Sequence, residues 1–126
     1  MPELSFVAPI EPVPKSRPRT VSVKDRAGRV RRVSTYTPKR CKDFERDLSL
    51  YAIRAISAAW DKAGPFTVRL DIYCRTARRV DLDNLCKAVL DALNGIVWND
   101  DCDVTQLSAA KDIDRENPRV EVTVNG

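Results

Sequence analysis

Four aspartates and one lysine have the residue types and spacing that could do chemistry. Asp81 and Asp83 are separated by one residue, Lys87 follows four residues after Asp83, and Asp100 and Asp101 stand together further on. Two carboxylates held close together repel each other, so they share either a proton or a cation. Mg²⁺, with Mn²⁺ as an alternative, prefers oxygen ligands of this kind. These aspartates therefore predict a site for a divalent metal ion.

Other chemistries are excluded by composition. The sequence contains no histidine, which removes the Ser-His and Cys-His nucleophilic mechanisms. Its four cysteines are widely spaced and include no CxxC pair, so a zinc site is not indicated and partly buried, reduced thiols are expected. Any catalysis must use carboxylates, lysine, hydroxyl groups or a metal ion.

A helix over residues 82–94 would position the acidic residues. Its apolar side chains fall on one broad arc, while Asp83, Lys87 and Asp91 fall together on the opposite side. Asp81 precedes the helix in an extended segment and should project to the same side as Asp83. Asp101 would become a third ligand if the strand that follows it lies beside the start of this helix.

Each of these residues also has an ordinary structural explanation. Aspartate is a favoured helix N-cap, and the "NDD" segment at 99–101 is a common turn composition. Lys87 is spaced to pair with Asp83 or Asp91 within the helix, an interaction worth about 0.2–0.5 kcal/mol. Each explanation accounts for one residue at a time, so the whole set favours the metal site.

The positive charge lies in a different part of the chain. Residues 15–42 hold eleven Lys or Arg against Asp25 alone, although the net charge of the whole protein is only +4. A solvated loop is the simpler explanation, but so many uncompensated cations favour a polyanionic partner. The predicted DNA-contacting residues, which include two near the aspartates, are Lys15, Arg17, Arg19, Arg29, Arg31, Arg32, Lys39, Arg40, Arg78 and Arg79.

The apolar patterning predicts an α+β fold in one small domain, residues 1–126, with a basic region at about 12–40 and an acidic region at about 78–103. No apolar run approaches the roughly 18 residues needed to cross a membrane, and the N-terminus lacks a signal-peptide pattern, so a cytoplasmic protein is expected. The expected elements are a strand at 4–10, a hairpin at 20–36, a helix from Pro38 to about Trp60 capped by Thr37, a strand at 66–74, the helix at 82–94, and strands at 102–111 and 118–126.

The segments "VDLDNLCKAVLDALNG" and "VWNDDCDV" resemble the signature of the RusA family of Holliday junction resolvases. That signature combines D-x-D-N-x-x-K at a helix start with a paired aspartate just before a strand. The upstream segments "PVPKSRPR" and "YTPKR" are also similar to segments of these proteins. The resemblance extends from about Pro12 to the C-terminus.

This resemblance implies a mixed β-sheet packed with two main helices. It also implies a bacterial or phage-encoded homodimer that needs Mg²⁺ and resolves four-way DNA junctions by paired symmetric nicks in recombination and repair. Asp81, Asp83 and Asp101 match the family's essential acidic residues, and Lys87 matches its essential lysine. Asp91 and Asp100 also match, Asp100 as an additional metal ligand. The sequence departs from some members at Val80, which interrupts the basic run before Asp81.

Two alternatives from other classes stay open. The chain could be a DNA-binding module without catalysis, in which the acidic residues serve as caps and turns. It could also be a metal-dependent nuclease that acts on forks or flaps rather than on four-way junctions. Junction cleavage with and without Mg²⁺ separates these hypotheses.

Overall fold

A computed structural model describes residues 3–15, 19–36, 38–77 and 79–126, with only the backbone described at 19–21, 23 and 31–36. A four-stranded sheet in the order β1-β6-β4-β5 forms the body. β1 and β4 run antiparallel to β6, and β4 runs parallel to β5, so the sheet is mixed. The strands are β1 (Glu3–Ala8), β4 (Phe66–Cys74), β5 (Val104–Ile113) and β6 (Arg119–Asn125).

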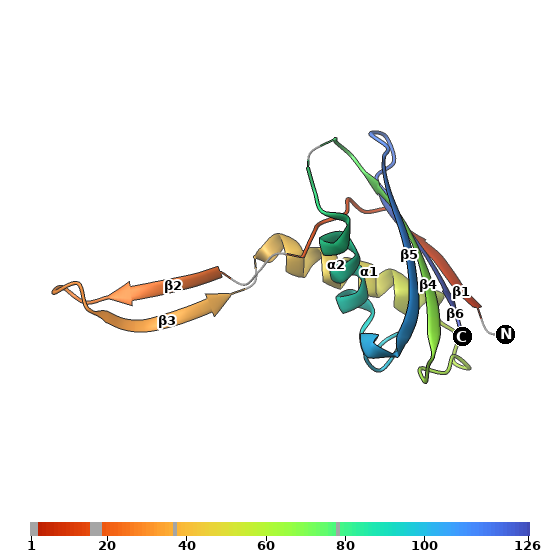
Figure 1. Cartoon of the computed structure of the whole chain (residues 1–126), viewed down its shortest axis with the longest axis horizontal. Coiled ribbons are helices and arrows are strands. Elements are labelled where there is room, and N and C mark those ends of the chain that lie inside the picture. Colours follow the sequence, from red (N-terminus) through yellow and green to blue (C-terminus); the bar gives the residue numbers. More distant parts are fainter. Residues whose placement is uncertain (1–2, 16–18, 37, 78) are drawn as a thin grey trace.

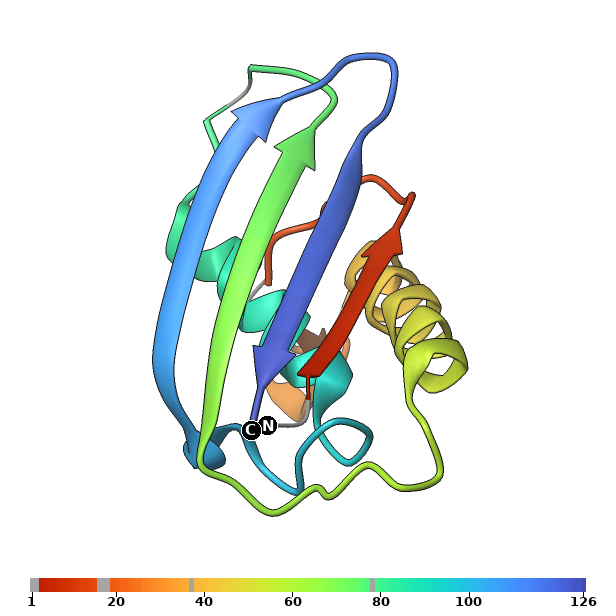
Figure 2. The ribbon, with the colours of Figure 1, turned by 90° about the vertical axis from the view of Figure 1, so that its right-hand side faces the viewer.

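Two helices, α1 (Lys39–Ala55) and α2 (Leu82–Leu93), cover one face of this sheet, as Figure 2 shows. The expected α+β fold with a mixed sheet and two main helices is confirmed. The core lies between the two layers because alternate strand residues point toward the helices. Neither helix, nor any other in the described ranges, is long and apolar enough to cross a membrane. The fully buried large side chains are Trp98, Phe66, Leu48, Leu70, Ile72, Leu85, Leu93, Val68, Val89, Val97, Val120 and Val122.

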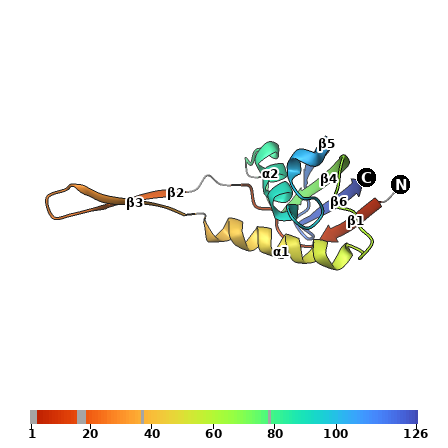
Figure 3. The same cartoon turned by 90° about the horizontal axis from the view of Figure 1, so that it is seen from below.

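The basic hairpin projects from this body. Strands β2 (Arg19–Lys24) and β3 (Val30–Tyr36) pair antiparallel as a separate two-stranded sheet, which extends away from the helices in Figures 1 and 3. Its turn is closed by Asp25, whose Oδ1 accepts hydrogen bonds from the backbone N–H groups of Ala27 (3.0 Å) and Arg29 (2.9 Å). Gly28 completes the turn with φ +80°, a conformation that favours glycine.

The first helix is shorter than its sequence predicts. It ends at Ala55, and Ile56 is extended, whereas the expected end was about Trp60. Trp60 contacts the body instead: its indole Nε1 donates to the carbonyl of Val97 at 2.8 Å and its ring stacks on Phe66. This long-range contact overrides the local helical pattern. The expected cap, Thr37, lies outside the described residues, and Pro38 occupies the N-cap position.

Helix α2 forms the crossover between the parallel strands β4 and β5. Such a crossover starts at the end of the first strand and returns to the start of the second. Val104, the first residue of β5, accordingly pairs with Phe66, the first residue of β4. The short 3₁₀ segment Asp101–Asp103, which leads into β5, therefore lies at the same end of the sheet as Phe66.

Candidate active site

The exposed edge of α2 carries Asp83, Lys87 and Asp91, one turn apart, as the sequence predicts. Asp83 and Lys87 are exposed, while the Asp91 side chain keeps only 18% of its surface accessible. The opposite side of the helix is buried against the core. Gly95, which follows the helix, has φ +80° and provides the expected left-handed stop.

Asp81 occupies the N-cap position of α2 without acting as a side-chain cap. Its backbone is extended, with φ −70° and ψ 130°, and its side chain makes no capping hydrogen bond. Within the described part of the chain its exposed carboxylate has no hydrogen-bond or ion-pair partner. The neighbouring Asp83 accepts one local bond at Oδ1, from the backbone N–H of Asn84 at 2.9 Å. Helix capping therefore does not explain Asp81.

Lys87 connects the helix to the second acidic segment. Its Nζ lies 3.1 Å from Asp91 Oδ1 and 3.7 Å from Asp101 Oδ2. Asp101 begins the short 3₁₀ helix Asp101–Asp103 and is half-buried. The hydrogen bond and charge of Asp91, more than those of Asp101, raise the pKa of Lys87 above its ordinary value. The ammonium therefore stays protonated at neutral pH.

The structure does not bring the predicted metal ligands into one group. Among the described residues, no set of three or more acidic or thiol side chains is arranged to hold a metal ion. Asp101 Oδ2 lies 3.7 Å from the Lys87 ammonium. Asp100 is exposed, and its charge is the main cause of a raised pKa at the neighbouring Cys102 thiol. The donor types nevertheless suit Mg²⁺, since the side chains are all carboxylates and that of Asp81 has no other described partner.

Lys15 extends this set of contacts into the other helix. Its Nζ lies 2.7 Å from Glu45 Oε1 on α1 and 3.1 Å from Asp91 Oδ2 on α2. The hydrogen bond to Glu45 is the largest of the effects that raise the pKa of Lys15. A continuous series of contacts results, which we call the ion-pair chain: Glu45, Lys15, Asp91, Lys87 and Asp101.

A family model described as "Endodeoxyribonuclease RusA" matches residues 9–125, nearly the whole chain. The chain belongs to the RusA endodeoxyribonuclease family. The resemblance carried by the two aspartate segments is thus confirmed, and the family supports a DNA-cleaving enzyme. No curated protein matches the chain.

Apart from Lys15, the described residues predicted to contact DNA in this RusA-family protein lie on the hairpin, on α1 and beside Asp81. Arg29 is exposed in the hairpin turn, Lys39 and Arg40 are exposed in the first turn of α1, and Arg79 is exposed two residues before Asp81. The backbones of Arg19, Arg31 and Arg32 lie in β2 and β3. Two further predicted contacts, Arg17 and Arg78, lie outside the described residues.

Lys111 is a cation near the site that sequence reasoning missed. It lies near the end of β5, and its Nζ donates to the carbonyl of Val80 at 2.6 Å. This contact places an exposed ammonium next to the backbone that leads into Asp81. Its position follows from the parallel pairing of Ile72 with Lys111, a register that no local sequence signal reveals.

An open, mainly apolar groove of about 550 Å³ lies between α2 and the edge strand β5. Its polar members, Asp83 and Lys87, belong to the candidate site. The groove therefore provides open space beside both side chains. Its lining residues are Leu82, Asp83, Cys86, Lys87, Leu90, Leu107 and Ala109.

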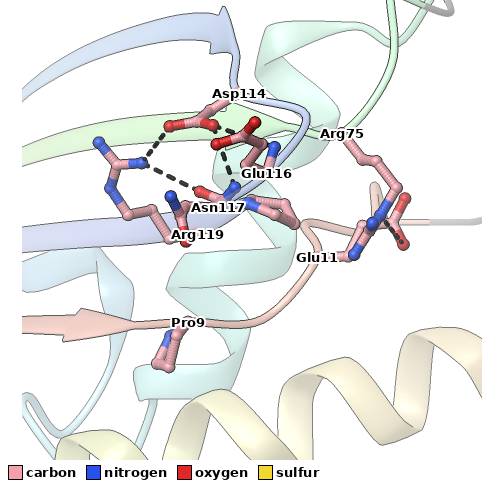
Figure 4. Close-up of a pocket in the computed structure, with 8 residues that line it drawn as sticks. Pro9, Glu11, Arg75, Asp114, Glu116, Asn117 and Arg119 are labelled. Carbon is pink, nitrogen blue, oxygen red and sulfur yellow. Dashed lines mark hydrogen bonds and ion pairs between the residues drawn. The ribbon is translucent and has the colours of Figure 1, made fainter.

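A second pocket, of about 570 Å³, contains none of the predicted site residues (Figure 4). Its arginines already have carboxylate partners: Arg119 lies 2.8 Å from Asp114, and Arg75 lies 3.8 Å from Glu11. Because these cations are paired, the pocket is poorly suited to bind phosphate. The candidate active site is therefore the α2 edge, although it is the more open surface.

Proposed function

We propose that this RusA-family protein is an Mg²⁺-dependent endonuclease that resolves four-way DNA junctions by paired symmetric nicks. One observation carries the proposal: α2 presents Asp81, Asp83 and Lys87 at the protein surface, and Lys87 lies within 3.7 Å of Asp101. These are the four residues that match the family's essential positions. The family match over residues 9–125 supports the same reaction class.

The metal ligands in this proposal are Asp81, Asp83 and Asp101, with Asp100 beside them. Because these described carboxylates do not form one group in the structure, the ion would have to draw Asp101 away from Lys87. Mg²⁺, or Mn²⁺ in its place, would polarise the scissile phosphate and lower the pKa of a bound water. Three carboxylates repel one another unless a cation lies between them. Asp81 is the most available ligand, since ion binding there would break no contact within the described residues.

Lys87 would stabilise the negative charge that develops on the phosphate oxygens. Its ammonium is protonated, about half exposed and able to reach a phosphate in the adjoining groove. A fixed cation at such a position lowers the barrier because it favours the transition state more than the ground state. Asp91 holds the ammonium at 3.1 Å and leaves its other protons for the substrate.

The basic hairpin and the start of α1 would bind the DNA backbone. Lys39, Arg40 and Arg29 are exposed cations that offset the repulsion between an acidic site and DNA. Aromatic residues are few, at 6% of the chain, so contacts to backbone and shape should outweigh base stacking. Paired nicks need two sites, and a two-fold homodimer would supply them with symmetry that matches the junction.

The deciding experiment compares end-labelled synthetic four-way junctions, forks, flaps and linear duplex, each with Mg²⁺ and with EDTA. We expect discrete symmetric nicks in the junction only when Mg²⁺ is present. Junction binding without cleavage at any Mg²⁺ or Mn²⁺ concentration would instead identify a non-catalytic DNA-binding protein. Equal cleavage of forks or flaps would contradict the junction specificity and leave the nuclease assignment intact.

A further inference from the structure

We propose that Lys15 and Asp91 are positioning residues that hold the Lys87 ammonium in place and connect the base of the hairpin to the candidate active site. The inference rests on the proposed role of Lys87 in cleavage. Under this inference Lys15 positions Lys87 and does not contact a DNA phosphate, although it belongs to the basic segment. It also gives Asp91 a defined role in the motif.

Asp91 is the central member of the ion-pair chain. Its Oδ1 lies 3.1 Å from Lys87 Nζ, and its Oδ2 lies 3.1 Å from Lys15 Nζ, so each oxygen contacts a different ammonium. Only 18% of its side-chain surface is exposed. Two partners on opposite sides of a mostly buried carboxylate fix its orientation, and the carboxylate in turn limits where Lys87 can lie.

Lys15 is held at its backbone and at its side chain. Its N–H donates to the carbonyl of Asn84 on α2 at 2.9 Å, and its Nζ contacts Glu45 on α1 at 2.7 Å. Strand β2 of the hairpin begins four residues later, at Arg19. Lys15 therefore lies just before the hairpin and contacts both helices. Its backbone bonds to Asn84, the residue after Asp83, and its side chain contacts Asp91.

The two contacts of Asp91 hold Lys87 in position more firmly than an isolated helix ion pair could. An isolated i,i+4 helix pair such as Lys87 with Asp91 is weak, too weak to hold a long, flexible side chain in one position. Lys15 fixes the carboxylate from the other side. If Asp91 were replaced by a neutral residue, no anion would lie between the Lys15 and Lys87 ammonium groups. The two cations would then repel each other, and Lys87 would move away from its present position.

The test separates catalytic rate from DNA affinity. We expect Asp91→Asn to lower the single-turnover rate of junction cleavage at saturating protein by up to about 100-fold, as misplacement by about 1 Å can. Lys15→Met should lower the rate in the same way, with junction Kd nearly unchanged, and Lys15→Arg should restore much of it. Asp71→Asn is the matched control, because it removes a carboxylate from the Arg69 ion pair on β4, away from α2.

If Lys15→Met raised the junction Kd and left the cleavage rate unchanged, the proposal would be overturned and Lys15 would be a phosphate contact. A readout without DNA completes the test: the ¹H–¹⁵N signals of the lysine ammonium groups. We expect the Lys87 signal to shift in both Asp91→Asn and Lys15→Met, and to stay in place in Asp71→Asn. An unmoved Lys87 signal in Lys15→Met would also overturn the proposal.

The two proposals can fail separately. If the parent protein cuts no junction, the proposed function fails, while the Lys87 signal still decides whether Lys15 and Asp91 hold that ammonium. Thermal unfolding checks that each variant is folded. If Asp91→Asn does not fold, the partly exposed Lys15 still provides the decisive variants, Lys15→Met and Lys15→Arg.

Discussion

At the scale of single residues, the site depends on which side chains are already engaged and which are available. The Asp81 carboxylate has no described partner, whereas Lys87 is held by Asp91 at 3.1 Å and reaches Asp101 at 3.7 Å. The predicted helix pair between Lys87 and Asp91 is thus present, but more than half of the Lys87 side chain, 55%, remains exposed. A pair this exposed adds little to stability, so stability and catalysis can be measured apart at Lys87.

Replacing Lys87 by alanine tests the cation directly. We expect Lys87→Ala to abolish junction cleavage, with near-normal junction binding and a loss of unfolding free energy of only about 0.5 kcal/mol. Gel-based cleavage, fluorescence anisotropy and urea unfolding would measure the three quantities. Lys62→Ala is a suitable control, because Lys62 is exposed and its Nζ donates to the carbonyl of Gly95. Full cleavage activity in Lys87→Ala would remove this lysine from the mechanism.

Neutralising Asp81 tests the metal ligand without breaking a described contact. Asp81→Asn should bind junction DNA at least as tightly as the parent, because a negative charge that repels phosphate is lost. It should nevertheless fail to cut, and its thermal stability should be unchanged. Asp61→Asn controls for surface charge, because Asp61 is an exposed aspartate whose Oδ1 accepts a local backbone hydrogen bond from Ala63. Cleavage by Asp81→Asn at the parent rate would place the metal site elsewhere.

At the scale of elements, local sequence patterns predicted the helices and strands. Long-range contacts determined where these elements end and which elements lie beside them. The α2 helix followed its apolar periodicity and ended at Leu93, with Asn94 as its C-cap before Gly95. The end of α1 did not follow its periodicity, because Trp60 binds Val97 and Phe66. The place of Asp101 depended on whether β5 pairs parallel to β4, and that pairing is a property of the sheet.

Trp60 offers a test of the contact that sets the end of α1. We expect Trp60→Ala to destabilise the fold by about 3 kcal/mol, since it removes a large aromatic side chain that packs on the core. Trp60→Phe keeps the ring contact with Phe66 and loses the hydrogen bond to Val97, so about 1 kcal/mol is expected. Urea unfolding followed by circular dichroism measures both. Equal losses in the two variants would show that the hydrogen bond, and not packing, dominates.

In the candidate site, too, some features follow from the local sequence and others only from long-range contacts. The spacing of Asp81, Asp83 and Lys87 was visible in the sequence because one short segment carries all three. The contacts of Lys15 with Glu45 and Asp91 were not, since they join three segments that only the folded chain brings together. Lys111 was missed for the same reason: its approach to Val80 depends on strand register.

At the scale of the whole molecule, the basic hairpin and the acidic residues of the candidate site lie on different parts of the structure. The hairpin extends away from the sheet (Figure 1) and carries Arg29 exposed at its turn, while the aspartates of the candidate site lie along α2 and before β5. Under the proposed function, this separation would let DNA bind to one part while its scissile phosphate approaches another. Affinity should therefore depend on salt mainly through the hairpin and the start of α1.

The salt dependence of DNA affinity tests whether the hairpin and the start of α1 contact the DNA backbone. On duplex arms, log K should fall with log[salt] with a slope of about −0.9 for each phosphate neutralised. Arg29→Gln and Lys39→Ala should each reduce the magnitude of that slope by about 1. Arg69→Gln, on β4 and paired with Asp71, should leave the slope unchanged. A slope that does not change in Arg29→Gln would show that the hairpin turn does not contact the backbone.

The two ends of the described chain meet at the far side of the body from the hairpin. Glu3 on β1 pairs with Asn125 on β6, so β1 begins and β6 ends at the same end of the sheet, as Figure 2 shows. A biotin or fluorophore attached at either terminus would thus sit remote from bound nucleic acid. Immobilised through that end, the molecule would present its basic arm to solution, an orientation suited to watching single junctions arrive, be cut and depart.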